Sequence, residues 1–103
     1  MPKQVVVRYK AKPDRAEENQ RLIEKVFAEL HATAPGGVRY AAFRLADGVS
    51  FVHVASIERG DGSNPLTEVA AFSEFQAHIA ERCQEQPTGQ DARVVGSYHF
   101  LAT

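Results

Sequence analysis

The sequence predicts an α+β sandwich in which two helices cover one face of a four-stranded antiparallel sheet. Three observations predict this fold class: a hairpin around Asp47-Gly48, an amphipathic helical pattern on each side of that hairpin, and a strand-like segment near each end of the chain. The resulting element order is β-α-β-β-α-β. At 103 residues the chain has the length of one domain, which we expect to span residues 1–103.

The first strand and the first helix are expected on either side of a proline. Residues 4–10 are rich in valine and form a short predicted strand. Asp14 followed by Glu17 resembles a capping box, and apolar residues then recur at helical spacing. We therefore expect an amphipathic helix over residues 14–33, which the Pro35-Gly36-Gly37 segment ends.

The predicted hairpin fixes how its two strands pair. Asp-Gly suits a type I′ turn, because both central positions of that turn need positive φ. The two-residue turn then pairs Ala46 with Val49, Arg44 with Phe51, Ala42 with His53, Tyr40 with Ala55, and Val38 with Ile57. These side chains share one face of the sheet, and the other face carries Ala41, Phe43, Leu45, Val52 and Val54. Both faces are apolar, so both need cover.

The second helix is expected from about Pro65 to Gln84, after an Asn64-Pro65 start signal. Pro87 and Gly89 are expected to end it, and residues 92–101 to form the last strand. With right-handed crossovers this order gives a ferredoxin-like sandwich, whose helices leave one sheet face open. An apolar open face predicts a homodimer in which two sheets pack face to face.

The composition excludes several classes of function. The chain is 44% hydrophobic and 24% charged, as in an ordinary soluble globular protein. A net charge of −1 argues against a general nucleic-acid or anionic-membrane binder, since such affinity rests on excess Lys and Arg. The first residues lack a signal-peptide pattern, and no apolar run approaches the about 20 residues of a spanning helix. We therefore expect a cytoplasmic protein without nucleic-acid or membrane partners.

The element order and the apolar sheet resemble the dimeric α/β-barrel superfamily. Within it, the chain is most similar to antibiotic-biosynthesis-monooxygenase-like proteins, above all those without an established substrate. The short segments that carry the resemblance are Phe51-Val52-His53-Val54, residues 72–78, and Val95-Gly96-Ser97-Tyr98. The resemblance implies a homodimer with a small apolar pocket between sheet and helices in each subunit. It also implies oxidation of a small aromatic or quinone-like compound by dioxygen, without metal, flavin or other cofactor.

A site of that kind needs a polar group that stabilises the deprotonated substrate inside a dry pocket. We expect His53 to be the catalytic base, because imidazole titrates near working pH, with Tyr98 as a second catalytic residue. His53 equally suits a core histidine bonded to Tyr40, Arg44 or a backbone carbonyl. The expected ligand-binding residues are Tyr40, Arg44, Phe51, Phe72 and His78. Tyr98 and His99 point to opposite sides of their predicted strand, so only one of them lines a given cavity.

Several other interpretations fit parts of the same sequence pattern. A non-catalytic homodimeric binding or assembly module fits the same pattern. Heme-degrading relatives use a histidine of the second helix, where His78 lies, but also an Asn and a Trp, and this chain has no Trp. RNA-recognition motifs share the element order, yet their third-strand pattern is matched only at Gly48, Phe51 and Val52. Cys83 suits a packed core better than a nucleophile, and the histidine spacing shows no metal signature.

Overall fold

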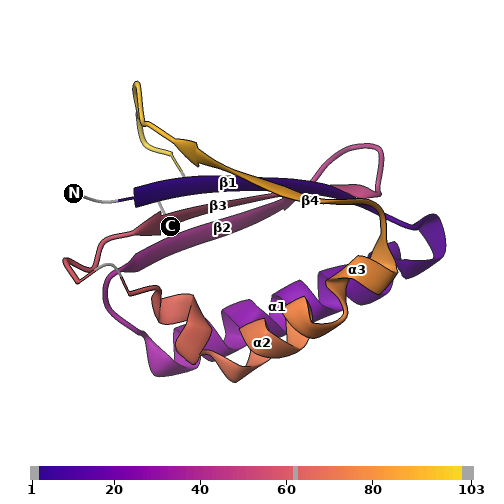
Figure 1. Cartoon of the computed structure of the whole chain (residues 1–103), viewed down its shortest axis with the longest axis horizontal. Coiled ribbons are helices and arrows are strands. Elements are labelled where there is room, and N and C mark those ends of the chain that lie inside the picture. The colour runs from indigo at the N-terminus through magenta and orange to yellow at the C-terminus, as the bar shows by residue number, and fades with distance from the viewer. Residues whose placement is uncertain (1–2, 62, 101–103) are drawn as a thin grey trace.

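A computed structural model describes residues 3–61 and 63–100. Its elements are β1 (Lys3–Ala11), η1 (Pro13–Arg15), α1 (Ala16–Thr33), β2 (Val38–Arg44), β3 (Ser50–Ile57), η2 (Pro65–Glu68), α2 (Ala70–Ala77), α3 (Ile79–Arg82) and β4 (Cys83–Ala92). The strands form one antiparallel sheet in the order β2-β3-β1-β4. The helices form a second layer on one face of that sheet (Figure 1). The predicted ferredoxin-like α+β sandwich is confirmed.

The predicted register of the hairpin is confirmed along the whole β2–β3 ladder. The observed pairs include Arg44–Phe51, Ala42–His53, Tyr40–Ala55 and Val38–Ile57. The remaining predicted pair, Ala46–Val49, lies beyond the ladder, in the turn. Register is robust here because a slip of one residue would carry every apolar side chain to the other face.

The predicted type I′ turn is wrong. The turn closes between Leu45 and Gly48, through a bond of 2.9 Å from the Gly48 N–H to the Leu45 carbonyl. Gly48 has a φ of 79°, whereas Asp47 is not among the residues with positive φ. The Asp47 carboxylate instead accepts the N–H groups of Val49 and Ser50 at 3.0 and 2.8 Å. These hydrogen bonds from the backbone to the Asp47 side chain form an Asx-turn, which is favoured here over the predicted type I′ turn.

The helices cover the sheet face that carries Tyr9, Phe51 and His53. The buried hydrophobic core consists of Tyr9, Ala11, Ala16, Val26, Phe51, Phe75 and Cys83. Cys83 is therefore a packed core residue, as expected. Side chains alternate along a strand, so the open face carries the other apolar set, which includes Ala41, Phe43, Val52 and Val54.

The prediction of one helix from Pro65 to Gln84 is wrong. The segment divides into η2, α2 and α3, and Cys83 already begins β4. Pro87 and Gly89, expected to end the helix, lie inside this strand. The β1–β4 register shifts between Arg8 and Lys10, where β4 carries extra residues. Pro87 falls at that irregularity of an edge strand, where a residue without an N–H group is tolerated.

The predicted last strand, residues 92–101, is also wrong beyond Ala92; Leu101 lies outside the described residues. β1 is already paired on both edges, by β3 and β4, so it offers residues 93–100 no free edge. This C-terminal segment instead crosses the open sheet face. Val94 and Phe100 border a hollow there with Ala41 and Val54. No helix in the described part of the chain is long and apolar enough to cross a bilayer.

Candidate functional site

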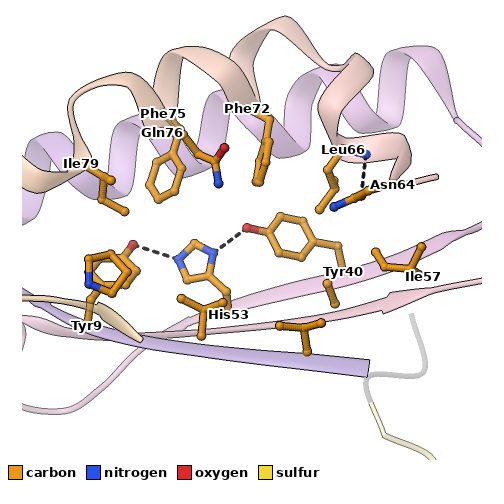
Figure 2. A pocket seen from close by; sticks show the side chains of 14 residues that line it. Tyr9, Tyr40, His53, Ile57, Asn64, Leu66, Phe72, Phe75, Gln76 and Ile79 are labelled. Carbon is orange, nitrogen blue, oxygen red and sulfur yellow. Dashed lines mark hydrogen bonds between the residues drawn. The ribbon is translucent and has the colours of Figure 1, made fainter. Parts of the chain in front are cut away.

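A pocket of about 450 Å³ lies between the sheet and the helix layer. Strands β1, β2 and β3 form its floor, and η2, α2 and α3 form its roof (Figure 2). It is lined by Val5, Val7, Tyr9, Tyr40, His53, Ala55, Ile57, Asn64, Leu66, Phe72, Phe75, Gln76, Ile79 and Pro87. The lining is mostly apolar and aromatic, which is typical of a small-molecule site.

A row of three hydrogen-bonded rings crosses the floor of this pocket. His53 lies between two tyrosines: its Nδ1 atom is 2.5 Å from the Tyr40 hydroxyl oxygen, and its Nε2 atom is 2.8 Å from the Tyr9 hydroxyl oxygen. Figure 2 shows the rings of Phe72 and Phe75 above this row, on the helix side. His53 is only 5% exposed. Both of its ring nitrogens are occupied, so its nitrogens reach a ligand only through a tyrosine.

The row continues behind the pocket into the core. The Nδ2 atom of Asn19, in α1, donates to the Tyr9 hydroxyl at 2.8 Å. The Arg82 guanidinium donates from Nε to Asn19 Oδ1 at 3.0 Å and from Nη2 to the Phe75 carbonyl at 2.8 Å. Asn19 is 0% and Arg82 1% exposed. Phe75 is in the last turn of α2, where carbonyls lack helical partners, so Arg82 satisfies one of them.

Burial keeps the three rings uncharged at neutral pH. It lowers the pKa of His53 to about 4, because a buried imidazolium loses its hydration. For the same reason burial raises the pKa of Tyr9 and the pKa of Tyr40. The floor of the pocket therefore presents neutral hydrogen-bonding groups in an apolar surrounding, where each hydrogen bond is electrostatically stronger than in water.

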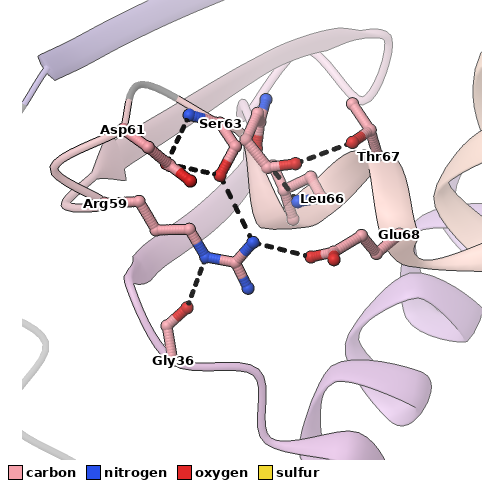
Figure 3. A network of polar contacts seen from close by, with 8 residues as sticks. Gly36, Arg59, Asp61, Ser63, Leu66, Thr67 and Glu68 are labelled. Atoms are coloured by element: carbon pink, nitrogen blue, oxygen red, sulfur yellow. Dashed lines mark hydrogen bonds and ion pairs between the residues drawn. The ribbon is translucent and has the colours of Figure 1, made fainter.

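Two sets of polar contacts hold the roof in place. Glu29 of α1 accepts the backbone N–H groups of Ala70 and Ala71 at 3.0 Å each, and so caps the start of α2. In the loop before η2, Arg59 pairs with Glu68 at 2.9 Å and reaches the Gly36 carbonyl at 3.4 Å (Figure 3). Carboxylates at a helix start are stabilised by the free N–H groups there. These contacts position the aromatic side chains of α2 over the sheet.

The structure brings together three of the residues predicted from the sequence. Tyr40, His53 and Phe72 all line the pocket. Phe51 lies beside them but is core: its ring stacks on Tyr9 with centroids 5.4 Å apart and does not line the cavity. His53 lines the cavity and is also a buried histidine bonded to Tyr40, which was the alternative role predicted for it.

The other predicted site residues lie elsewhere. Arg44 is at the sheet edge and donates to Glu17 and Gln20 at 2.8 and 2.7 Å. His78 lies on the surface, with its Nδ1 atom 3.5 Å from a Glu81 carboxylate oxygen. Tyr98 is 87% exposed on the C-terminal segment, and none of these residues borders the pocket.

Sequence reasoning missed Tyr9, Asn19 and Arg82 as members of the site. A signal for the last two exists in the helical pattern. Asn19 shares an apolar stripe with Ala16 and Ile23, and Arg82 shares one with Phe75 and Ile79, at spacings of three, four and seven residues. A polar residue on such a stripe must find a partner when the stripe is buried.

Two other cavities have fewer groups that could take part in a reaction. One of about 520 Å³ lies between the open sheet face and the C-terminal segment, and one of about 560 Å³ lies between α1 and β2. Neither is lined by a pair of hydrogen-bonded buried titratable groups. Within residues 3–61 and 63–100, no cluster of three or more His, Cys, Asp or Glu side chains is placed to hold a metal ion.

Comparisons with known proteins relate the fold to antibiotic-biosynthesis-monooxygenase-like proteins. No family model and no curated protein matches the sequence. A Nitrosomonas europaea protein provisionally named an antibiotic biosynthesis monooxygenase superposes with a TM-score of 0.73 at 16% identity, over 91% of this chain and 90% of that one. PA3566 from Pseudomonas aeruginosa gives 0.73 at 15% identity, over 92% and 95%. NE2512 from Nitrosomonas europaea, of unknown function, gives 0.70 at 16%, over 95% and 94%. The chain shares its fold with these proteins over nearly its whole length.

Proposed function

We propose that the pocket binds a small aromatic or quinone-like molecule. Its volume of about 450 Å³ lies within the about 300–1,000 Å³ of small-molecule sites. The rings of Phe72 and Phe75 above the floor suit offset or edge-to-face contacts with a flat ligand. Polar groups are concentrated in the row Tyr40–His53–Tyr9, which gives such a ligand one defined orientation.

The reaction that this arrangement supports is a cofactor-independent oxygenation. A ring CH₂ beside a phenol oxygen loses a proton, and the resulting anion supplies the electrons that reduce dioxygen. One oxygen atom becomes a new carbonyl group, and the other leaves as water with the two CH₂ hydrogens. The observation that carries this proposal is the Tyr40 hydroxyl, bonded to His53 at 2.5 Å on the floor of an apolar pocket. A hydroxyl donor there stabilises the substrate anion.

In this proposal Tyr40 contacts the substrate, and His53 is a positioning residue behind it. His53 was expected to act as a base. Its pKa of about 4 and its two bonded nitrogens make it a weak proton acceptor at neutral pH. The proton of the substrate therefore leaves to solvent or to dioxygen-derived anions, and Tyr40 lowers the cost of the anion that remains.

Oxygen consumption with a panel of phenols, hydroquinones and polyphenols that each carry a ring CH₂ in a fused ring tests the activity. The wild-type protein is compared with Tyr40→Phe, and Tyr98→Phe serves as a matched control at an exposed site. We expect uptake that falls about tenfold or more in Tyr40→Phe and is unchanged in Tyr98→Phe, because one charge-assisted hydrogen bond is lost. Equal rates for wild type and Tyr40→Phe would contradict the proposed role of Tyr40.

A non-catalytic binding module is the second candidate, favoured by the neutral and fully bonded state of His53. Saturable binding of the same compounds without oxygen uptake would support this module and exclude the oxygenase. We also propose that the chain forms a homodimer through its open sheet face, where Ala41, Phe43, Val52 and Val54 lie beside the exposed Val94 and Phe100 of the C-terminal segment, which would be part of the interface. A second copy is the occupant whose apolar face matches this one in size and character.

A further inference from the structure

We infer that the hydrogen bonds from Arg82 to Tyr40 all run in one direction, so that Tyr40 offers its hydroxyl hydrogen to the pocket. Arg82 and Asn19 are then positioning residues, which fix the tautomer of His53. The pocket would select ligands that present an accepting oxygen, such as a phenolate, an enolate or a quinone carbonyl. The ligand class rests on the proposed function, whereas the direction of the hydrogen bonds does not.

The direction is set at Arg82, because a guanidinium can donate hydrogen bonds but cannot accept them. Its Nε atom lies 3.0 Å from the side-chain oxygen of Asn19, in a position where both residues are buried. The amide of Asn19 must therefore turn its oxygen toward Arg82 and its nitrogen toward Tyr9, at 2.8 Å. The opposite amide orientation would place two donors against each other.

The orientation of Asn19 determines the direction of the hydrogen bond between Tyr9 and His53. The Tyr9 oxygen accepts from Asn19 and has one hydrogen of its own, and His53 Nε2 lies 2.8 Å away. If Nε2 carried a hydrogen, that of Tyr9 would have no acceptor among the described residues. Tyr9 is 3% exposed, whereas Tyr40 is only partly buried, so an unsatisfied donor costs more at Tyr9, by about 1–3 kcal/mol for a buried group. Tyr9 therefore donates to Nε2. A neutral imidazole then carries its hydrogen on Nδ1.

The Tyr40 hydroxyl then accepts from His53 and keeps its own hydrogen free. His53 donates from Nδ1 to the Tyr40 oxygen at 2.5 Å. In the described part of the chain, no hydrogen bond joins the Tyr40 hydroxyl to any other residue, so its own hydrogen is left for a ligand in the pocket it lines. No carboxylate forms an ion pair with Arg82 among the described residues, so its positive charge is not neutralised by a direct partner there.

Asn19→Asp should reverse every hydrogen bond between residue 19 and Tyr40, whereas Arg82 still donates to residue 19. The new carboxylate accepts from both Arg82 and Tyr9, because it has no hydrogen to donate. Tyr9 then accepts from His53 Nε2, and the Nδ1 atom becomes the acceptor for the Tyr40 hydroxyl. Gln20→Glu is the matched control: it makes the same chemical change at the next position of α1, where Gln20 bonds Arg44 outside the row.

The tautomer of His53 is measured by ¹⁵N NMR on ligand-free protein labelled at histidine, with the His53 signals assigned by their loss in His53→Asn. We expect hydrogen on Nδ1 in wild type and in Gln20→Glu, and on Nε2 in Asn19→Asp. Hydrogen on Nε2 in wild type, or the same tautomer in folded Asn19→Asp, would overturn the inference. If Asn19→Asp does not fold, Tyr40→Phe decides: the Nδ1 hydrogen should persist, and its move to Nε2 would show that Tyr40 sets the tautomer.

Binding of 4-nitrophenolate tests the ligand class separately. We expect about tenfold weaker binding to Asn19→Asp than to Gln20→Glu, since the Tyr40 hydroxyl then donates to His53 Nδ1 and not to the ligand. Equal affinities would overturn the ligand class, even where the tautomer agrees. If no protein binds the phenolate, the proposed function and the ligand class both fail, and the direction of the row is still decided by the NMR measurement.

Discussion

The Arg82 guanidinium donates to the side-chain oxygen of Asn19 at 3.0 Å, although these residues are 63 positions apart in the chain. The bond joins α1 to α3 at the centre of the molecule, where both side chains are buried. Arg82 also lies over the Phe75 ring, 5.2 Å from its centroid, which offsets part of the cost of burying a charge. This pair links the stability of the helix layer to the chemistry of the pocket.

Removing either partner should destabilise the fold, and removing both should cost less than the sum. Asn19→Leu leaves the Arg82 Nε donor and the Tyr9 oxygen without their partner, so we expect a loss of about 2–4 kcal/mol in the free energy of unfolding. In a double-mutant cycle with Arg82→Met, measured by urea unfolding, the coupling energy should be about 1–3 kcal/mol. Additive effects of the two substitutions would show that the bond contributes nothing specific.

The stability should depend on pH through His53. Its pKa is about 4 when folded and about 6.5 when unfolded, so the unfolded chain binds the proton more tightly. The stabilisation is complete above about pH 6.5 and is lost as the pH falls toward 4, by about 3 kcal/mol in total. The measurement is the free energy of urea unfolding between pH 4 and 8. The difference in unfolding free energy between wild type and His53→Gln cancels the contribution of the other titrating groups. It should decrease as the pH falls from 8 to 4, and a constant difference would contradict the lowered pKa.

The turn of the hairpin should be sensitive at Gly48. A methyl group there has space, since the nearest atom to a Cβ would be an Arg44 nitrogen at 3.9 Å, but the φ of 79° is strained for any residue with a Cβ. We expect Gly48→Ala to lower the free energy of unfolding by about 1 kcal/mol. Gly60→Ala, which meets no atom within 4 Å and has no positive φ, is the control and should change it little. An equal effect at both positions would contradict the backbone explanation.

The proposed homodimer can be tested at the open sheet face. Sedimentation of the wild-type protein at micromolar concentration should show a particle of twice the 11.3 kDa chain mass. Phe43→Lys should shift it to a monomer, because a charge on the apolar face must be desolvated to pair two sheets. Ala32→Lys, at an exposed position at the end of α1, should leave the dimer intact. A stable, soluble wild-type monomer would contradict the proposal.

The sequence predicts those parts of the fold whose determinants are local. Alternation and the turn residues fixed the register of the hairpin, in which Ala42 pairs with His53. The last strand depends on pairing with β1, and its sequence, with Pro87 and Gly89 among polar residues, carries no local strand signal. The last strand was predicted at residues 92–101 instead, because these residues have high strand propensity. Strand propensity does not show which segment pairs with a free sheet edge.

In the candidate site, too, the residues set by local pattern were predicted and those set by long-range packing were not. Tyr40 and His53 were predicted together because the hairpin register places them on one face of the sheet, and Phe72 because helical spacing places it on a buried stripe; the sequence left open which sheet face the helices cover. Asn19 and Arg82 were not, although each lies on an apolar stripe of its helical pattern, because helical spacing does not show which two polar residues meet when the helices pack together. Their partnership joins positions 63 apart in the chain, and no sequence pattern indicated the break between α2 and α3 that lies close to Arg82.

The ionisation of a nitrophenol bound in the pocket tests the role of Tyr40 most directly, because its anion absorbs visible light. Absorbance titrations of the bound compound give its pKa in wild type, Tyr40→Phe and the Tyr98→Phe control. If Tyr40 donates to the anion, the pKa of the bound nitrophenol is lower in wild type and Tyr98→Phe than in Tyr40→Phe, by about one unit or more. The same bound pKa in all three proteins would contradict this role.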